Sequence, residues 1–152
     1  MKMDPSGEQK PSNPKDLIGS DKLPLHLWPG VSTAYGCLGL LDGMLKYGRQ
    51  NWRKAGVRYT IYLDALLRHV LAEYEGEDSD PDSGLPHDSH ALACLAIITD
   101  ARAVGKLEDD RAYNGSGYRE HINMLTQHVA RLKAKHQEAG HAPRHYTIKD
   151  TV

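Results

Sequence analysis

Apolar side chains recur at intervals of three and four residues through most of this chain, and this spacing limits the folds open to it. The clearest case begins near Arg58 and includes Leu63, Leu66, Leu67, Val70, Leu71 and Tyr74. Residues three and four apart share one face of an α-helix, so the segment predicts a helix with one buried side. No segment alternates apolar and polar residues over five positions. We therefore expect an all-α fold.

Three other segments show the same period. One helix is expected from about Ala34 to Gly48, where Gly36, Gly39 and Gly43 would let another helix approach closely. Another should begin near Pro86, capped by Asp82 or Ser83. In a fourth helix the apolar residues follow a repeat close to 3.5, which often indicates pairing with a second chain: Ile122, Leu125, Val129, Leu132 and His136.

The remaining segments are polar or contain prolines. We expect a mobile tail over residues 1–12 and another over 138–152. Between them, residues 13–137 should form one helical domain that includes an extended apolar arm over residues 13–30. Residues 47–53 are expected to form a polar turn.

Composition limits the partners of the chain. With 152 residues and 39% hydrophobic side chains it can build one core. The 19 Lys and Arg residues are balanced by 20 Asp and Glu residues, so there is no uniform positive field for nucleic acid. Apolar runs are too short to cross a membrane, and two cysteines, Cys37 and Cys94, provide no disulfide framework. A cytoplasmic setting is expected.

The main chemical feature is an acidic stretch, with seven Asp or Glu residues in the sixteen positions from Glu73 to Asp88. Such a stretch is either a solvated loop or a site for a cation. Carboxylates that converge where two packed helices meet would suit Mg²⁺, with Mn²⁺ as a substitute. Zinc is disfavoured because Cys and dense His ligands are lacking.

Three histidines accompany the acids. His87 and His90 lie at the start of the third helix, where they could hydrogen-bond the loop or instead bind phosphate and transfer protons. His69 has the same two interpretations. Its neighbour Arg68 could pair with Asp64 on the helix surface or bear phosphate charge.

A second cluster comprises Lys46, Tyr47, Asn51, Trp52 and Arg53. The aromatic rings could stack on a base, the Asn51 amide could bond a base edge, and Lys46 or Arg53 could reach a phosphate. Alternatively, Trp52 fills a gap beside the first helix. Together with a carboxylate-held cation, the cluster predicts a nucleotide pocket.

These motifs resemble one family. The strings that carry the resemblance are Asn13-Pro14-Lys15-Asp16, Lys22-Leu23-Pro24-Leu25, Lys46-Tyr47-Gly48, Asn51-Trp52-Arg53, Arg68-His69, Gly76-Glu77, Asp80, Asp82-Ser83-Gly84, His87 and His90-Ala91. Over residues 13–102 they are similar to the phage dATP/dGTP diphosphohydrolases, which belong to the MazG-like all-α nucleotide pyrophosphohydrolases. Some of these come from phages that place 2-aminoadenine in their DNA.

The resemblance implies hydrolysis of purine (deoxy)nucleoside tri- and diphosphates at the α-phosphorus, with dGTP giving dGMP and pyrophosphate. In a 2-aminoadenine pathway, dGMP would feed an enzyme similar to adenylosuccinate synthetase. The chain departs from MazG relatives, which hold metals with ExxE and ExxD motifs on facing helices. Here one helix offers Glu73 and Glu77, and the next offers His87 and His90.

The site residues implied by the resemblance fall into three groups. Catalytic roles fall to Glu77, His87 and His90. Ligands for two or three Mg²⁺ ions are Glu73, Glu77, Asp80 and Asp82, with Asp88 in reserve. Nucleotide contacts are Lys22, Lys46, Tyr47, Asn51, Trp52, Arg68 and His69. The resemblance also implies a homo-oligomer, a dimer or a dimer of dimers, in which two chains share a site.

Two other interpretations stay open. His69, His87-Asp88 and a later aspartate, Asp100 or Asp110, could form the pattern of HD-domain phosphohydrolases, which release triphosphate. The chain could also be a helical interaction module without catalysis, in which the acidic loop binds a basic partner.

Overall fold

The computed structural model describes residues 13–112, 115 and 117–150. Within them the order of elements is α1 (Pro14–Ser20), the 3₁₀ helix η1 (Leu25–Leu27), α2 (Gly30–Tyr47), α3 (Asn51–Ala55), β1 (Val57–Arg58), α4 (Tyr59–Tyr74), α5 (His87–Ala103), β2 (Leu107–Glu108), α6 (Tyr118–Glu138) and the 3₁₀ helix η2 (Ile148–Asp150). The expected all-α fold is confirmed, because the parallel pair β1–β2 has only two residues per strand. The tail expected over residues 1–12 lies outside the described residues.

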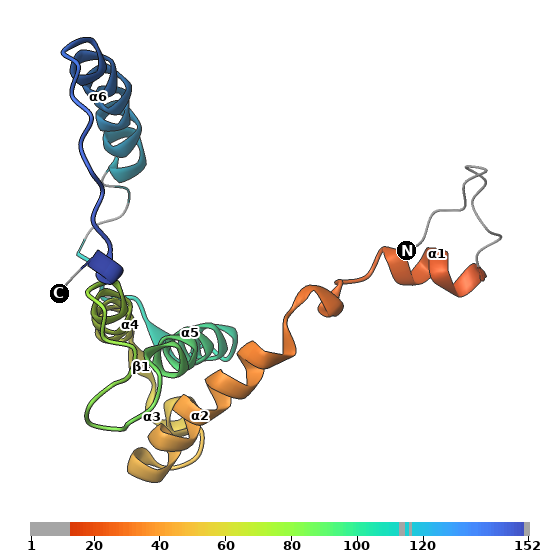
Figure 1. The fold of residues 1–152 in the computed structure, drawn as a ribbon. Helices are drawn as coiled ribbons and strands as arrows, with labels where there is room; N and C mark the ends of the chain where they lie inside the picture. Colours follow the sequence, from red (N-terminus) through yellow and green to blue (C-terminus); the bar gives the residue numbers. More distant parts are fainter. Residues whose placement is uncertain (1–12, 113–114, 116, 151–152) are drawn as a thin grey trace.

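The central helix of the fold is α5, against which both α2 and α4 pack (Figure 1). Its buried residues include Ala93, Ile98 and Ala101. Gly39 of α2 lies against α5 so closely that a Cβ there would collide with the carbonyl oxygen of Ser89. This confirms the close helix approach expected at Gly39. The close approach expected at Gly43 is absent, because a Cβ there would meet no described atom within 4 Å.

The expected helix ends are largely confirmed. Helix α2 stops before Gly48, which has a φ of 92° and donates its N–H to the Met44 carbonyl at 2.8 Å. Helix α4 stops at Tyr74, so Glu77 lies on the following loop and not on the helix. The predicted cap of α5 is wrong. Its N-cap is Pro86, and the Ser83 side chain bonds elsewhere in the loop.

Two segments that we expected to be non-helical contain short helices. The side chain of Asn13 accepts a hydrogen bond from the backbone N–H of Lys15, and the Asp16 carboxylate accepts one from the backbone N–H of Asn13. This capping box, with Pro14 at the first helical position, begins α1 in place of extended chain. Likewise α3 occupies part of the predicted turn over 47–53.

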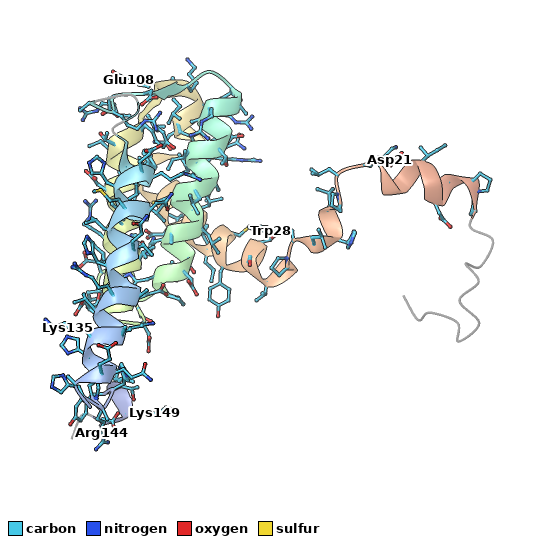
Figure 2. All side chains as sticks on the ribbon, turned by 90° about the horizontal axis from the view of Figure 1, so that it is seen from above. Asp21, Trp28, Glu108, Lys135, Arg144 and Lys149 are labelled. Carbon is cyan, nitrogen blue, oxygen red and sulfur yellow. The ribbon has the colours of Figure 1, made fainter. Side chains whose placement is uncertain are left out.

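The arm formed by α1 and η1 nevertheless projects away from the helical body, and Figure 2 shows Asp21 and Trp28 along it. Its apolar side chains find no groove in the single chain. Leu23, Leu25 and Leu27 are 81%, 75% and 72% exposed. Within the described part of the chain, these leucines are thus left on the surface.

At the other end of the chain, α6 stands apart from α2, α4 and α5 (Figure 1). After α6 the chain turns at Gly140, with a φ of 73°, and returns toward the C-terminal end of α4. There Ile148 of η2 lies beside Gly76, whose Cβ, if present, would be 3.5 Å from it. In the described part of the chain, no helix combines the length and hydrophobicity needed to span a bilayer.

Candidate active site

The acidic stretch forms a short hairpin between α4 and α5. Backbone hydrogen bonds close this hairpin, from the Asp80 N–H to the Leu85 carbonyl at 2.9 Å and from the His87 N–H to the Asp78 carbonyl at 3.3 Å. Because α4 and α5 are antiparallel neighbours, the hairpin brings the last turn of one beside the first turn of the other. This places the loop acids and His69, His87 and His90 at one end of the bundle.

A chain of hydrogen bonds runs through this end. The Glu77 Oε1 lies 2.9 Å from Nε2 of His87, and the Nδ1 atoms of His87 and His69 are 2.9 Å apart. A carboxylate only accepts, so His87 donates its Nε2–H to Glu77; in the tautomer that continues this chain, Nδ1 of His87 accepts the Nδ1–H of His69. The lone pair of a neutral His69 is then on Nε2. Burial, followed by the charges of His90 and His87, lowers the pKa of His69 below its usual 6.5.

The third histidine, His90, is held by a residue of the hairpin loop, Ser83. The Ser83 hydroxyl donates to Oδ2 of Asp80 at 2.7 Å, so at the 2.7 Å contact between Ser83 and His90 the Nε2–H of His90 is the donor. The ring of His90 also stacks on that of His69, with centroids 4.7 Å apart. The hydrogen bonds from Ser83 hold the pKa of Asp80 below its usual value. We call His69, Glu77, Asp80, Ser83, His87 and His90 the mouth cluster.

Within the mouth cluster the histidines differ in access. His87 is 3% exposed and has both ring nitrogens engaged. His69 and His90 are half-buried and reach the surface of the mouth. A molecule bound at the mouth can therefore meet His69 and His90 directly, while His87 acts on it only through its neighbours.

The predicted metal ligands lie along the hairpin but do not converge as a cage. Glu73 is half-buried on α4, Asp80 is half-buried in the loop, and Glu77 and Asp82 are exposed. Among the residues that the structure describes, no three His, Cys, Asp or Glu side chains are grouped as metal ligands. Mg²⁺ typically takes one or two carboxylates, with waters and substrate phosphates as its other ligands, so this donor set fits it when a nucleotide is present.

The predicted phosphate-binding cations are distributed unevenly. Lys46, on the last turn of α2, pairs with Asp42 at 2.7 Å; this hydrogen bond raises the pKa of Lys46, with a smaller contribution from Asp80. Arg68 is exposed on α4 beside His69. Lys22 follows Asp21 on the projecting arm and so lies away from the mouth of its own chain (Figure 2).

The predicted base-binding residues follow one another along α2 and α3. Tyr47 is exposed at the end of α2, and Asn51 begins α3 with Trp52 next to it. Trp52 reaches the C-terminal end of α5, where its indole N–H donates to Oδ2 of Asp100 at 2.6 Å. Since His87 and Asp100 are both on α5, Asp100 lies about 20 Å from His87 along the helix axis at 1.5 Å per residue.

Asp100 is a residue whose role the sequence analysis missed. Its carboxylate accepts two hydrogen bonds from Arg53, at 2.6 and 2.8 Å, besides the one from Trp52. These donors, Arg53 first, lower the pKa of Asp100 to about 2. We call Trp52, Arg53 and Asp100 the latch. No local sequence pattern links Arg53 to Asp100, because the two residues are 47 positions apart. The sequence showed only that Asp100 is an acidic residue near the end of an apolar helix face.

The HD-type pattern is only half assembled. His69 and His87 come together, but Asp100 belongs to the latch, and Asp110 accepts hydrogen bonds from the backbone and hydroxyl of Thr60. Neither aspartate is thus available to the two histidines.

Comparison with known proteins shows to which family the chain belongs. A family model described as dATP/dGTP diphosphohydrolase, N-terminal, matches residues 12–111. The chain belongs to this family. The matched residues of the dATP/dGTP diphosphohydrolase N-terminal family include both the mouth cluster and the latch, and they end before α6.

One relative is a dATP/dGTP diphosphohydrolase of Salmonella phage PMBT28, which is 37% identical over 83 residues. The match covers 53% of this chain and 28% of that phage protein. The chain thus spans well under half of the relative that it matches. No solved structure matches it.

Proposed function

We propose that this chain hydrolyses purine (deoxy)nucleoside tri- and diphosphates, chiefly dGTP, GTP and dGDP, at the α-phosphorus. The products would be the monophosphate and pyrophosphate or phosphate. The observation that carries the proposal is the mouth cluster, where loop carboxylates and histidines meet in a member of the dATP/dGTP diphosphohydrolase N-terminal family. The name of the Salmonella phage relative supports the substrate class.

The proposed cofactor is Mg²⁺, replaceable by Mn²⁺, as two or three ions per site held by Glu73, Glu77, Asp80 and Asp82. The ions would neutralise the phosphates and lower the pKa of a water molecule. Lys46 and Arg68 would bear part of the remaining phosphate charge, because both carry side chains that reach solvent near the mouth.

The histidines take roles that follow from their access. We assign His69 to the substrate side, because its Nε2 has a free lone pair and can accept a proton at neutral pH. His90 presents an N–H held by Ser83. His87 is a positioning residue in place of the catalytic role first inferred, since its burial keeps it from substrate and its two hydrogen bonds orient Glu77 and His69.

A homo-oligomer is part of the same proposal. Apolar side chains on α2 and α4 remain exposed in the single chain, among them Leu38 at 43%, Leu67 at 54% and Leu71 at 57%. The arm that carries Lys22 also lies far from its own mouth. A second copy could cover these faces and bring its Lys22 to the site.

The decisive experiment incubates the chain with dGTP, GTP, dATP and dGDP, with and without Mg²⁺, and identifies the products. We expect dGMP and pyrophosphate from dGTP only when Mg²⁺ is present. Glu77→Gln should lower the rate at least 100-fold, the order seen when a charge-stabilising group is removed. The control is Asp64→Asn, an exposed carboxylate of α4 away from the mouth cluster.

Other outcomes would assign another function. Release of triphosphate would favour the HD-type chemistry, and absence of turnover with every nucleotide would favour an interaction module. If the chain formed dGMP, the product could feed the synthetase-like step of a 2-aminoadenine pathway.

A further inference from the structure

Helix α6 lies beyond the family-matched residues, and its apolar stripe from Ile122 to Leu132 stays exposed within the described part of the chain. The stripe is 43% exposed at Ile122, 54% at Leu125, 47% at Val129 and 48% at Leu132. On an isolated amphipathic helix such values mean that one whole face meets solvent. A helix of this kind gains most of its stability from packing, so α6 needs a partner.

The order of residues along the stripe indicates which partner. Helix α6 has 21 residues, or three heptads labelled a to g. Position a is occupied by Ile122 and Val129, and position d by Tyr118, Leu125 and Leu132. A β-branched residue at a with leucine at d favours a parallel pair of helices, whereas the reverse order favours three or four strands. His136, at the next a position, is hydrogen-bonded to His141 of its own chain, so the part of the seam that is open to a partner ends at Leu132.

The flanking residues permit two identical copies to pair. In a parallel pair each g position faces the e position five residues later in the other helix, which matches His121 with Thr126 and His128 with Lys133. Neither match joins two permanently charged residues of like sign. Arg131 and Gln127 lie on the outer face, away from the seam.

The returning C-terminal segment covers only the last turns of the seam. After Gly140 it passes beside the end of α6, where the rings of His136 and His141 stack with centroids 5.2 Å apart and their Nδ1 atoms lie 2.9 Å apart. The hollow between α6 and this segment measures 920 Å³ and is lined by Leu132 and His136. Ile122, Leu125 and Val129 do not line this hollow and stay open to a second helix.

We propose that α6 pairs in parallel and in register with α6 of a second copy, joining two family domains through a short coiled coil. The proposal is independent of the catalytic one, since it concerns residues outside 12–111. Two isolated helices of this length would pair only weakly. Contacts between the two domains would hold the helices near each other and so raise their effective concentration.

Cysteine crosslinking of the full chain tests the pairing. In a Cys37→Ser, Cys94→Ser background, Leu132→Cys should form a disulfide-linked dimer under mild oxidation, because identical d residues face each other only in a parallel pair. The matched control is Arg131→Cys, one position away on the outer face, which we expect to crosslink at least tenfold more slowly. Adding Leu125→Asp to the Leu132→Cys chain should abolish the crosslink.

Two results would overturn the proposal. Equal crosslinking of Leu132→Cys and Arg131→Cys would show random collision. Crosslinking only in a mixture of Ile122→Cys and Leu132→Cys chains would show antiparallel pairing. Because α6 stands apart from α2, α4 and α5, we expect these substitutions to leave that body intact, and circular dichroism with the nucleotide assay verifies this separately.

Discussion

The two ends of α5 carry similar residue types but arrange them differently. At its C-terminal end, the latch satisfies the Asp100 carboxylate with three hydrogen bonds from Trp52 and Arg53. At its N-terminal end, the mouth cluster gives only His87 a hydrogen bond at both ring nitrogens, and its carboxylate Glu77 stays exposed. A fully paired charge stabilises structure, whereas a partly paired cluster keeps donors and acceptors for a ligand. The comparison predicts that mouth variants lower the rate, whatever they do to stability, and that latch variants lower stability alone.

After Glu77→Gln, the largest effect should come from His87→Ala. This change removes the link between Glu77 and His69, and loss of such an orienting partner typically costs 10- to 100-fold in activity. It also removes a buried ring and leaves the half-buried His69 without its hydrogen-bond partner, which should lower the free energy of unfolding by about 1–3 kcal/mol. Steady-state kinetics and urea unfolding measure the two effects. A chain with full kcat would contradict the positioning role.

Asp100→Ala should show the opposite pattern. The indole N–H of Trp52 and the Arg53 guanidinium lose their shared acceptor, so we expect the melting temperature to fall by about 2–4 °C. The rate per folded molecule should stay unchanged, and Asp64→Ala provides the control for losing a surface carboxylate. A clear rise in KM would contradict a purely structural role for the latch, because it would indicate that Trp52 contacts the nucleotide.

The latch also predicts a pH dependence. The pKa of Asp100 is about 2 in the folded chain against 3.8 for an ordinary aspartate, so between these pH values the unfolded chain binds more protons. The stabilisation by the latch should therefore be complete above about pH 4 and decline as the pH falls toward 2. Urea unfolding of the wild type and Asp100→Asn at pH 5.5 and pH 3 should show a smaller difference at the lower pH. If the difference in unfolding free energy between the two proteins were the same at both pH values, Asp100 would not have the lowered pKa assigned to it in the latch.

The smallest effect is expected for Ser83→Ala. His90 loses the acceptor that orients its N–H, and Asp80 loses a hydrogen bond, so activity should fall several-fold with little change in stability. Ser79→Ala, in the same loop, is the matched control. If both variants behaved alike in the nucleotide assay, His90 would not depend on Ser83.

Much of the fold could be predicted from local patterns. The period of three and four located α2, α4, α5 and α6 because a helix repeats its buried face every 3.6 residues. The same reasoning failed where short-range hydrogen bonds decide. The capping box at Asn13 starts α1 in a proline-bearing segment, and Pro86 rather than Ser83 precedes α5.

For the site, the sequence by itself identified the acidic loop and its three histidines, since charge density and spacing are local properties. Only the tertiary structure decided that His87 is enclosed between Glu77 and His69, that Ser83 orients His90, and that Trp52 is bound by Asp100. Each of these contacts depends on how α5 is set against the elements around it. That placement follows from close packing, such as that of Gly39 against Ser89, which no sequence period records.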